Sequence, residues 1–305
     1  MYQVVPVVTV VTDMKEVTKR DIELWIQTIA KGEFHYKEVL DGGVSPASLG
    51  KVRKYIHELC YPKVGEPICE PVGRRDGYYR PIQDEAKPID FTNMGSHKDS
   101  GVILPFDLRK YVFLYPETVT IVAGSKSSGK TGFLYRTVAL NLGKINVRLL
   151  SNMEGGREQM YDRFKAMGID LANQSSFIYF VEDNFHDYIK ESNTLYVIDY
   201  IDAPEGVDFY VIGAQVMKVR KKLTKVGGSE AVIGLQKPYH RDIAVGGETT
   251  LKNADLYLAM DSSKLKIVDA KVPAQDNLHP KNMQWTFQYD DKGTNFLNIQ
   301  QSEEL

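Results

Sequence analysis

Short apolar runs alternate with stretches of helical periodicity over the latter part of this 305-residue chain. Runs of β-branched and other apolar residues predict buried strands, and apolar residues spaced three or four positions apart predict helices between them. The expected strands cover residues 119–122, 145–151, 177–181, 194–200, 231–235, 254–260, 265–270, 285–289 and 296–299, and the expected helices cover residues 132–142, 157–167 and 209–223.

The first 83 residues show a different pattern. Apolar residues at helical spacing predict helices over residues 18–31 and 34–40, and a third that follows Ser45 and Pro46, which suit the start of a helix. An extended stretch over residues 66–82 is interrupted at residues 73–77, which predicts the tip of a β-hairpin.

Residues 84–103 are polar, contain scattered Pro, Gly and Ser, and lack any hydrophobic period, which is typical of a linker. We therefore expect a small domain over residues 1–83, a linker over residues 84–103 and a larger domain over residues 104–305. A chain of this length has room for both domains.

The first strand of the larger domain runs into a glycine-bracketed loop that fits G-x-x-x-x-G-K-[ST] and opens a helix. Strand, loop and helix N-terminus in this order form a cradle of backbone N–H groups for phosphates. Lys130 is expected to reach the β- and γ-phosphates of ATP, and the Thr131 hydroxyl to contact Mg²⁺. The predicted nucleotide-binding residues are Gly124, Ser125, Lys126, Ser127, Ser128, Gly129, Lys130 and Thr131.

Two acidic residues lie at the ends of later strands. Asp199 ends the run 194–200, where an acid downstream of a phosphate loop gives the second contact to Mg²⁺. Glu154 follows the run 145–151, where a carboxylate can orient or deprotonate the attacking water. An acid near a helix N-terminus is also favoured by the helix dipole alone, so the position of Glu154 by itself supports both interpretations.

These motifs together resemble the ATPase domain of the RecA-like superfamily, in particular that of DnaB-type replicative helicases. Ile198-Asp199-Tyr200-Ile201 is similar to the family's I-D-Y-L, the stretch from Glu154 to Arg163 to its glutamate–E-Q-L–R stretch, and Gln236 to its sensor glutamine. The resemblance implies an α/β domain with a central, mostly parallel sheet flanked by helices. It also implies ATP and Mg²⁺ as cofactors, self-association, and Glu154, Lys130 and Gln236 as catalytic residues.

In that family ATP lies between subunits, and a neighbouring subunit supplies a K-x-R pair to it. The matching stretch has Lys271 at the lysine position but Pro273 where the arginine should be. Because an arginine supplied in trans raises turnover by orders of magnitude, the proline argues against fast, motor-like hydrolysis. Lys271 is the remaining catalytic candidate, and Lys264, Lys266 or Lys281 are alternatives.

The resemblance also implies DNA-contacting loops at residues 203–208 and 238–250. In the second loop Arg241 is the candidate phosphate contact, assisted by the backbone around Gly246 and Gly247. The alternative for Arg241 is a plain surface charge. The first loop is acidic and has no cation.

The small domain resembles a winged helix-turn-helix, in which the third helix enters the major groove and the hairpin contacts the backbone. Winged helices also dock onto proteins, and charged helix faces are often only solvated, so both interpretations stay open. The DNA contacts that the resemblance implies are Lys51, Arg53 and Lys54 on the helix and Arg74, Arg75 and Arg80 on the hairpin.

The net charge of −2 gives the chain no global basic field, so any contact with nucleic acid must be local. Cys60 and Cys69 are the only cysteines, which fits reduced thiols in a cytoplasmic protein. The apolar opening residues lack the basic region of a signal peptide and are too few to span a bilayer, so we expect no membrane contact.

The sequence thus predicts an ATP-dependent DNA-binding protein that assembles as a ring or filament. ATP hydrolysis would act as an assembly and release switch in DNA replication, recombination or transposition, with a replication or recombination protein as a candidate partner. One alternative is a translocating helicase. Another is an ATP-gated transcriptional regulator or scaffold whose hydrolysis does not respond to DNA.

Overall fold

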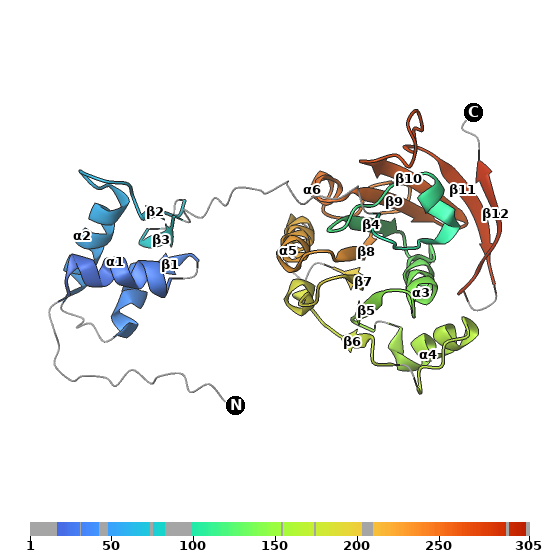
Figure 1. The fold of residues 1–305 in the computed structure, drawn as a ribbon, viewed down its shortest axis with the longest axis horizontal. Helices are drawn as coiled ribbons and strands as arrows, with labels where there is room; N and C mark the ends of the chain where they lie inside the picture. Colours follow the sequence, from blue (N-terminus) through green and yellow to red (C-terminus); the bar gives the residue numbers. More distant parts are fainter. Residues whose placement is uncertain are drawn as a thin grey trace. The chain divides into compact units, whose positions relative to one another are not determined.

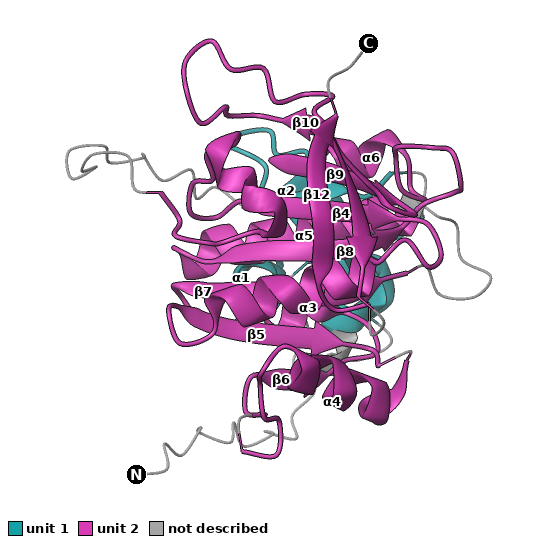
Figure 2. Ribbon diagram, turned by 90° about the vertical axis from the view of Figure 1, so that its right-hand side faces the viewer, with its two compact units in different colours: residues 1–92 teal, residues 93–305 magenta. Residues whose placement is uncertain are grey.

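The computed structural model describes residues 17–30, 32–42, 48–73, 76–82, 99–153, 155–173, 175–202, 210–290 and 293–302. The chain divides into two compact units, residues 1–92 and 93–305, each described by itself (Figures 1 and 2). Within the described ranges, no helix combines the length and the apolar character needed to span a bilayer.

Unit 1 is a small α+β unit whose two α-helices pack on a three-stranded antiparallel sheet in the order β1-β3-β2. Its core contains Ile22, Val52 and Ile56, all with no exposed surface. Cys60 and Cys69 are free and buried, with their Sγ atoms 3.0 Å apart. The elements are α1 (Lys19–Thr28), β1 (Phe34–His35), the 3₁₀ helix η1 (Tyr36–Gly42), α2 (Leu49–Cys60), β2 (Cys69–Pro71) and β3 (Tyr78–Pro81).

Two of the expected helices in unit 1 differ from the structure. Helix α1 starts at a capping box formed by Thr18 and Asp21 but ends at Thr28, before the predicted end at residue 31. The predicted helix over residues 34–40 is instead a short strand followed by a 3₁₀ helix, because Phe34 pairs with Tyr79 of β3 and is buried in the core. Ser45, which was expected to cap the third helix, lies outside the described residues.

Unit 2 is built on a nine-stranded sheet in the order β12-β11-β10-β9-β4-β8-β7-β5-β6. The strands from β9 to β6 in this order are parallel, and β10, β11 and β12 add an antiparallel edge. The α/β class and the mostly parallel sheet are confirmed. The strands are β4 (Val119–Gly124), β5 (Asn146–Ser151), β6 (Ile178–Phe180), β7 (Thr194–Ile201), β8 (Glu230–Gln236), β9 (Leu256–Asp261), β10 (Lys264–Ala270), β11 (Gln284–Tyr289) and β12 (Phe296–Ser302).

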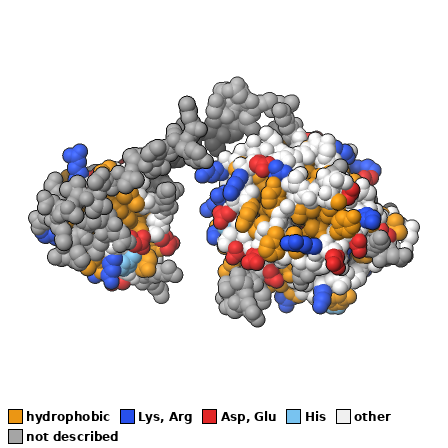
Figure 3. All heavy atoms as spheres, turned by 90° about the horizontal axis from the view of Figure 1, so that it is seen from below, with side chains coloured by type: hydrophobic (Ala, Val, Ile, Leu, Met, Phe, Trp, Pro, Cys, Tyr) orange, Lys and Arg blue, Asp and Glu red, His pale blue; other side chains and the backbone are white. Residues whose placement is uncertain are grey.

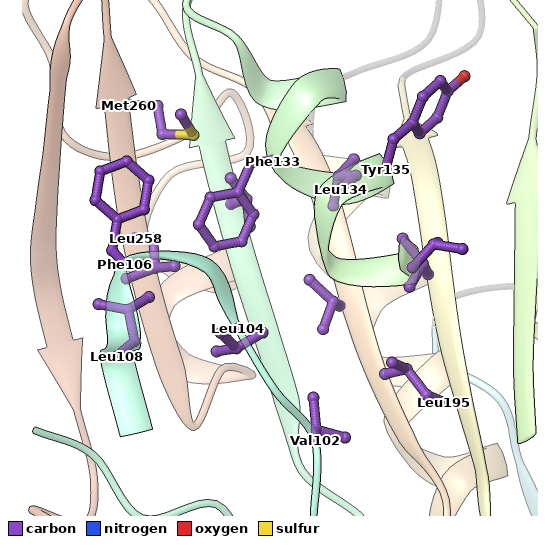
Figure 4. Close-up of a cluster of buried hydrophobic side chains, with 14 of the residues drawn as sticks. Val102, Leu104, Phe106, Leu108, Phe133, Leu134, Tyr135, Leu195, Leu258 and Met260 are labelled. Carbon is purple, nitrogen blue, oxygen red and sulfur yellow. The ribbon is translucent and has the colours of Figure 1, made fainter. Parts of the chain in front are cut away.

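Helices cover both faces of this sheet, and each face has its own core (Figure 1). Phe133 and Leu134 of α3 lie in one core, in which Phe133 is the closer of the two to Phe106 and Met260 (Figure 4). The other core is formed beneath α5. All six residues of β4 are buried, so the strand that leads into the phosphate loop is fixed from both sides. The helices are η3 (Pro105–Lys110), α3 (Lys130–Asn141), α4 (Gly156–Ala166), η4 (Phe185–Tyr188), α5 (Tyr210–Val226) and α6 (Glu248–Lys252).

The last residues of the predicted linker pack into unit 2. The backbone N–H of Ser100 donates to the carbonyl of Leu114 at 2.9 Å, and Val102 is 2% exposed in the core under α3 (Figure 4). Two adjacent apolar residues, Val102 and Ile103, are too few to form a periodic pattern, so the sequence does not indicate that this end of the stretch is packed. Of the two, Val102 is the buried one.

A buried carboxyl group lies at the edge of the sheet opposite to the phosphate loop. Glu230 begins β8 and is 6% exposed. Burial raises the pKa of Glu230 to about 8, with nearby Asp99 acting in the same direction, although a hydrogen bond with Ser100 and the charge of Arg109 oppose the shift. The folded state therefore holds a proton on Glu230 at pH values where the unfolded chain has lost it.

This difference predicts how stability depends on pH. The contribution of Glu230 to the free energy of unfolding is full below its ordinary pKa of 4.5 and is lost as pH rises toward about 8. The change is a few kcal/mol at most, at about 1.4 kcal/mol for each unit of pKa difference. Urea unfolding at pH 5 and pH 9 measures how much the free energy of unfolding falls between these two pH values. This fall should be smaller for Glu230→Gln than for the unaltered chain. The control Glu182→Gln changes an exposed residue and should show the same fall in the free energy of unfolding as the unaltered chain. An equal fall in all three proteins would contradict the prediction.

Candidate nucleotide-binding site

A pocket of about 690 Å³ opens where the parallel strands of unit 2 end. Because β4, β7 and β8 run in the same direction, their carboxyl ends meet at one edge of the sheet. The predicted loop residues Ser125 to Thr131 line this pocket together with Asp199 from β7 and Gln236 from β8. The structure therefore brings together motif residues that lie up to about a hundred positions apart in the chain.

The loop has the shape of a phosphate cradle. Gly129 has a φ of 90°, which favours glycine, and α3 begins at the next residue, Lys130. A Cβ atom at Gly124 would overlap the Ser128 hydroxyl, so the loop folds back tightly on its own strand. Ser128 Oγ is buried and has no hydrogen-bond partner among the described residues. A buried hydroxyl without a partner, next to the open N–H groups of a helix N-terminus, fits a phosphate oxygen.

Lys130 and Gln236 meet inside this pocket. The Lys130 side chain is largely buried, and its Nζ donates to Gln236 Oε1 at 3.4 Å. The same Nζ lies 3.7 Å from the centre of the Tyr200 ring, a distance typical of a cation–π contact. Tyr200 directly follows Asp199, so the end of β7 positions both the acid and the ring against this lysine.

Thr131 and Asp199 place two oxygens side by side. Thr131 Oγ1 donates to Asp199 Oδ1 at 3.2 Å. Burial raises the pKa of Asp199, while nearby Lys130 and hydrogen bonds from Thr131 and Tyr135 act in the opposite direction. A hydroxyl and a carboxylate are the oxygen ligands that Mg²⁺ prefers, so this donor set fits the ion that the sequence predicts.

The two other catalytic candidates do not lie in the described part of this pocket. Glu154 is outside the described residues, although Met153 and Gly155 on either side of it line the pocket. Lys271 is paired with Asp255 at 2.9 Å, just before β9, at the edge opposite to the phosphate loop. It therefore does not contact the pocket of its own chain, and its role toward a neighbouring subunit stays a prediction.

The candidate DNA loop after β8 forms a second pocket of about 750 Å³. Arg241 is exposed there, and Gly246 and Gly247 have φ values of 103° and 62°. Much of the lining is apolar, including Ile243 and Val245. The loop thus offers one cation beside an apolar hollow. The first candidate loop, residues 203–208, lies outside the described residues.

Three of the predicted DNA contacts in unit 1 are already ion-paired within the unit. Arg53 pairs with Asp76 at 2.7 Å, and Lys54 lies 3.9 Å from Glu58. Arg80 is paired with Glu70. These acids reduce the positive charge that the predicted DNA contacts would present, which the spacing of basic residues alone could not show. Lys51 is exposed on α2, and Arg74 and Arg75 lie outside the described residues.

Tyr289 is a residue of the site that no sequence pattern indicates. Its hydroxyl donates to the carbonyl of Ser128 at 2.6 Å, and a Cβ atom at Gly129 would overlap that hydroxyl. Tyr289 ends β11, far from the loop in sequence, and no motif marks it. A tyrosine of the antiparallel edge therefore holds the phosphate loop from the side.

A second contact fixes the start of the loop. Lys237 has a fully buried side chain and pairs with Asp261 at 2.6 Å. Ser125 Oγ donates to the same carboxylate at 3.0 Å. The first loop residue is thereby tied to the ends of β8 and β9.

Comparisons with known proteins add little to this geometry. No protein-family model and no curated protein matches the chain. Among solved structures, the crystal structure of the RadB recombinase is similar with a TM-score of 0.44 and 15% sequence identity, over 62% of this chain and 92% of that chain. The residues of the site are therefore the main indication of function.

The Tyr289 contact predicts a specific effect on nucleotide binding. Tyr289→Phe keeps the ring but leaves the Ser128 carbonyl without its donor, which costs about 1 kcal/mol. If the loop needs this bond to hold its shape, ATP affinity in the presence of Mg²⁺ falls roughly three- to tenfold. Isothermal titration calorimetry would measure the change. Tyr111→Phe, which removes a hydroxyl bonded to Gln301 on β12, is the control and should bind ATP normally. Equal losses in both variants, or none in either, would refute a positioning role for Tyr289.

Proposed function

We propose that this chain is an ATPase of the RecA-like type that binds DNA and self-associates. The observation that carries the proposal is the convergence of Lys130, Thr131, Asp199 and Gln236 on one pocket at the carboxyl edge of the sheet. The strand order supports it as well, because β8 separates the phosphate-loop strand β4 from β7, which ends near Asp199.

Each residue has a role that its surroundings support. The backbone of the loop and Ser128 Oγ would bind phosphate oxygens, and Lys130 would leave the Tyr200 ring to meet the β- and γ-phosphates. Thr131 and Asp199 would hold Mg²⁺, which when bound neutralises the charge of the phosphates. Gln236 lies next to Lys130, where it can register the presence of the γ-phosphate. Glu154 would orient the attacking water.

Slow hydrolysis, used as a switch, is the form of this activity that the chain favours. Pro273 stands at the position of the expected arginine, and Lys271 is paired with Asp255. Without a freely available arginine in trans, the transition state loses a major source of charge stabilisation. ATP-bound subunits would assemble as a ring or filament on DNA, and hydrolysis would release them, in DNA replication, recombination or transposition.

A regulator or scaffold is the second candidate, and the ion pairs of unit 1 favour it. The order of helices and strands in unit 1 and its sheet order β1-β3-β2 support a winged-helix arrangement. Since Arg53 and Arg80 are both paired with acids of the same unit, docking onto a protein is a reasonable use for it. In that case ATP would control assembly without DNA-stimulated hydrolysis. A translocating helicase would need another basic side chain at the trans position.

Steady-state ATP hydrolysis decides between these functions. We expect hydrolysis that requires Mg²⁺, disappears in Lys130→Ala, and rises several-fold with single-stranded or duplex DNA. A rate that is present but indifferent to every DNA offered would refute the coupled function and favour the regulator. Strand separation in a helicase assay would establish the translocating alternative and remove the switch.

We expect DNA to stimulate ATP hydrolysis through its contact with Arg241. Arg241→Gln removes the cation of the loop after β8 and should lower the DNA-stimulated rate several-fold while the DNA-free rate is unchanged. Lys144→Gln, which removes an exposed charge just after α3, is the matched control. If the two variants respond to DNA alike, Arg241 is only a surface charge.

A further inference from the structure

The second half of α5 has a basic face that the nucleotide site does not use. It is formed by Lys218, Lys221, Lys222 and Lys225, and we call it the α5 basic face. Residues three, four and seven positions apart lie on the same side of a helix, so the four side chains project together. The sequence of α5 contains no acidic residue that could neutralise them within the helix.

The four lysines take no part in the ion pairs of the described residues. Lys218, Lys221 and Lys225 are exposed, Lys222 is half-buried, and none of the four has an ion-pair partner among the described residues. Arg220 on the same helix behaves differently, because it forms a bidentate pair with Asp255 at 2.6 and 3.1 Å. One cation of α5 thus anchors the helix to the sheet, and the other four form no ion pair with any residue that the structure describes.

The neighbouring elements only partly offset this charge. The 3₁₀ helix η4 contributes Asp187, whose Oδ1 lies 3.6 Å from Nε2 of His186 in the same helix. Burial lowers the pKa of His186, and nearby Lys218 and Lys222 add to the shift while Asp187 opposes it, which indicates that both lysines lie close to η4. α6, which packs against α5, contributes both Glu248 and Lys252. Figure 3 shows acidic and basic side chains intermixed over much of the face of unit 2 that it presents.

The α5 basic face is separate from the sites described above. Helix α5 leads from the carboxyl end of β7 to the start of β8, so its second half lies toward the edge of the sheet opposite to the phosphate loop. The contact of Arg220 with Asp255, just before β9, confirms this position. Arg241 and its loop follow the carboxyl end of β8 instead.

We propose that the α5 basic face binds the phosphate backbone of nucleic acid without reading its sequence. Lys218 and Lys225 are about 10 Å apart along the helix axis, and duplex DNA carries one charge per roughly 1.7 Å, so several phosphates come within reach of the four ammonium groups. Lysine is a flexible point charge that suits such non-directional contacts. The face contains no aromatic side chain that could stack on bases.

Other uses of the face are less consistent with its composition. A helix that lies on a membrane needs a broad apolar face beside its lysines, whereas the exposed residues next to these are Ala214, Met217 and Thr224. Cations also stabilise the last turn of a helix through its dipole, but only Lys225 lies in that turn. The remaining three lysines are therefore not explained by helix stability.

The test measures DNA binding by the full chain without nucleotide, so that it is independent of ATP turnover. Fluorescence anisotropy with a labelled mixed-sequence duplex, repeated at several salt concentrations, gives the affinity and its salt dependence. We expect Lys218→Gln combined with Lys225→Gln to weaken binding several-fold and to reduce the slope of log affinity against log salt by about 2. Circular dichroism and ATP binding should not change.

The matched control is Lys110→Gln combined with Lys281→Gln, which removes the same charge from lysines that are paired with Asp107 and Asp269. Equal weakening in both double variants would assign the effect to net charge and overturn the proposal. Unchanged DNA binding in the α5 variant would also overturn it. Binding of both proteins to phosphatidylserine vesicles is measured in parallel, and an α5 variant that loses vesicle binding but keeps DNA binding would assign the face to a membrane surface instead. A chain with the expected DNA-binding result but no DNA-stimulated hydrolysis would keep the α5 site and lose only the coupled function.

Discussion

The burial of β4 between two parallel neighbours is the constraint on which the site depends. Backbone pairing to β8 on one side and β9 on the other leaves this strand no freedom to shift. Helices on both faces then exclude water from it. Its last residue, Gly124, is therefore held in place, and the loop that follows is directed to the edge where β7 and β8 also end. A register shift of β4 would separate Lys130 from both Asp199 and Gln236, because those two residues lie on the neighbouring strands β7 and β8.

The sequence could predict the parts of the fold that depend on local patterns. Buried parallel strands consist of continuous apolar runs, so β4, β7 and β8 were recognisable, and the loop motif marked Lys130 and Thr131. The local spacing around Phe34 predicts a helix, whereas the structure pairs Phe34 with Tyr79 on β3, a tertiary contact that local spacing does not record. Tyr289 was missed for the same reason, since the antiparallel edge that brings it to the loop is formed by residues much later in the chain.

Charges were the least predictable feature, because their meaning depends on which partner the fold supplies. Arg53 and Arg80 look like free cations in the sequence, yet each has an acid beside it. Arg220 and Lys221 are adjacent in the chain, but one is bound to Asp255 and the other faces solvent. A count of lysines and arginines cannot distinguish these cases. Only the three-dimensional distribution of acids separates cations that stabilise the fold from those available to a ligand.

The hydrogen bond from Tyr289 to Ser128 has a consequence for the thermodynamics of the site. A glycine-rich loop has many conformations in an unfolded chain, and selecting one of them costs entropy. Here the loop loses that conformational entropy during folding, when Tyr289 of β11 bonds to it, and not when a ligand binds. The cradle is preorganised, so a ligand does not have to order it. A residue at the margin of the sheet thus helps to set the shape of the loop through the fold itself.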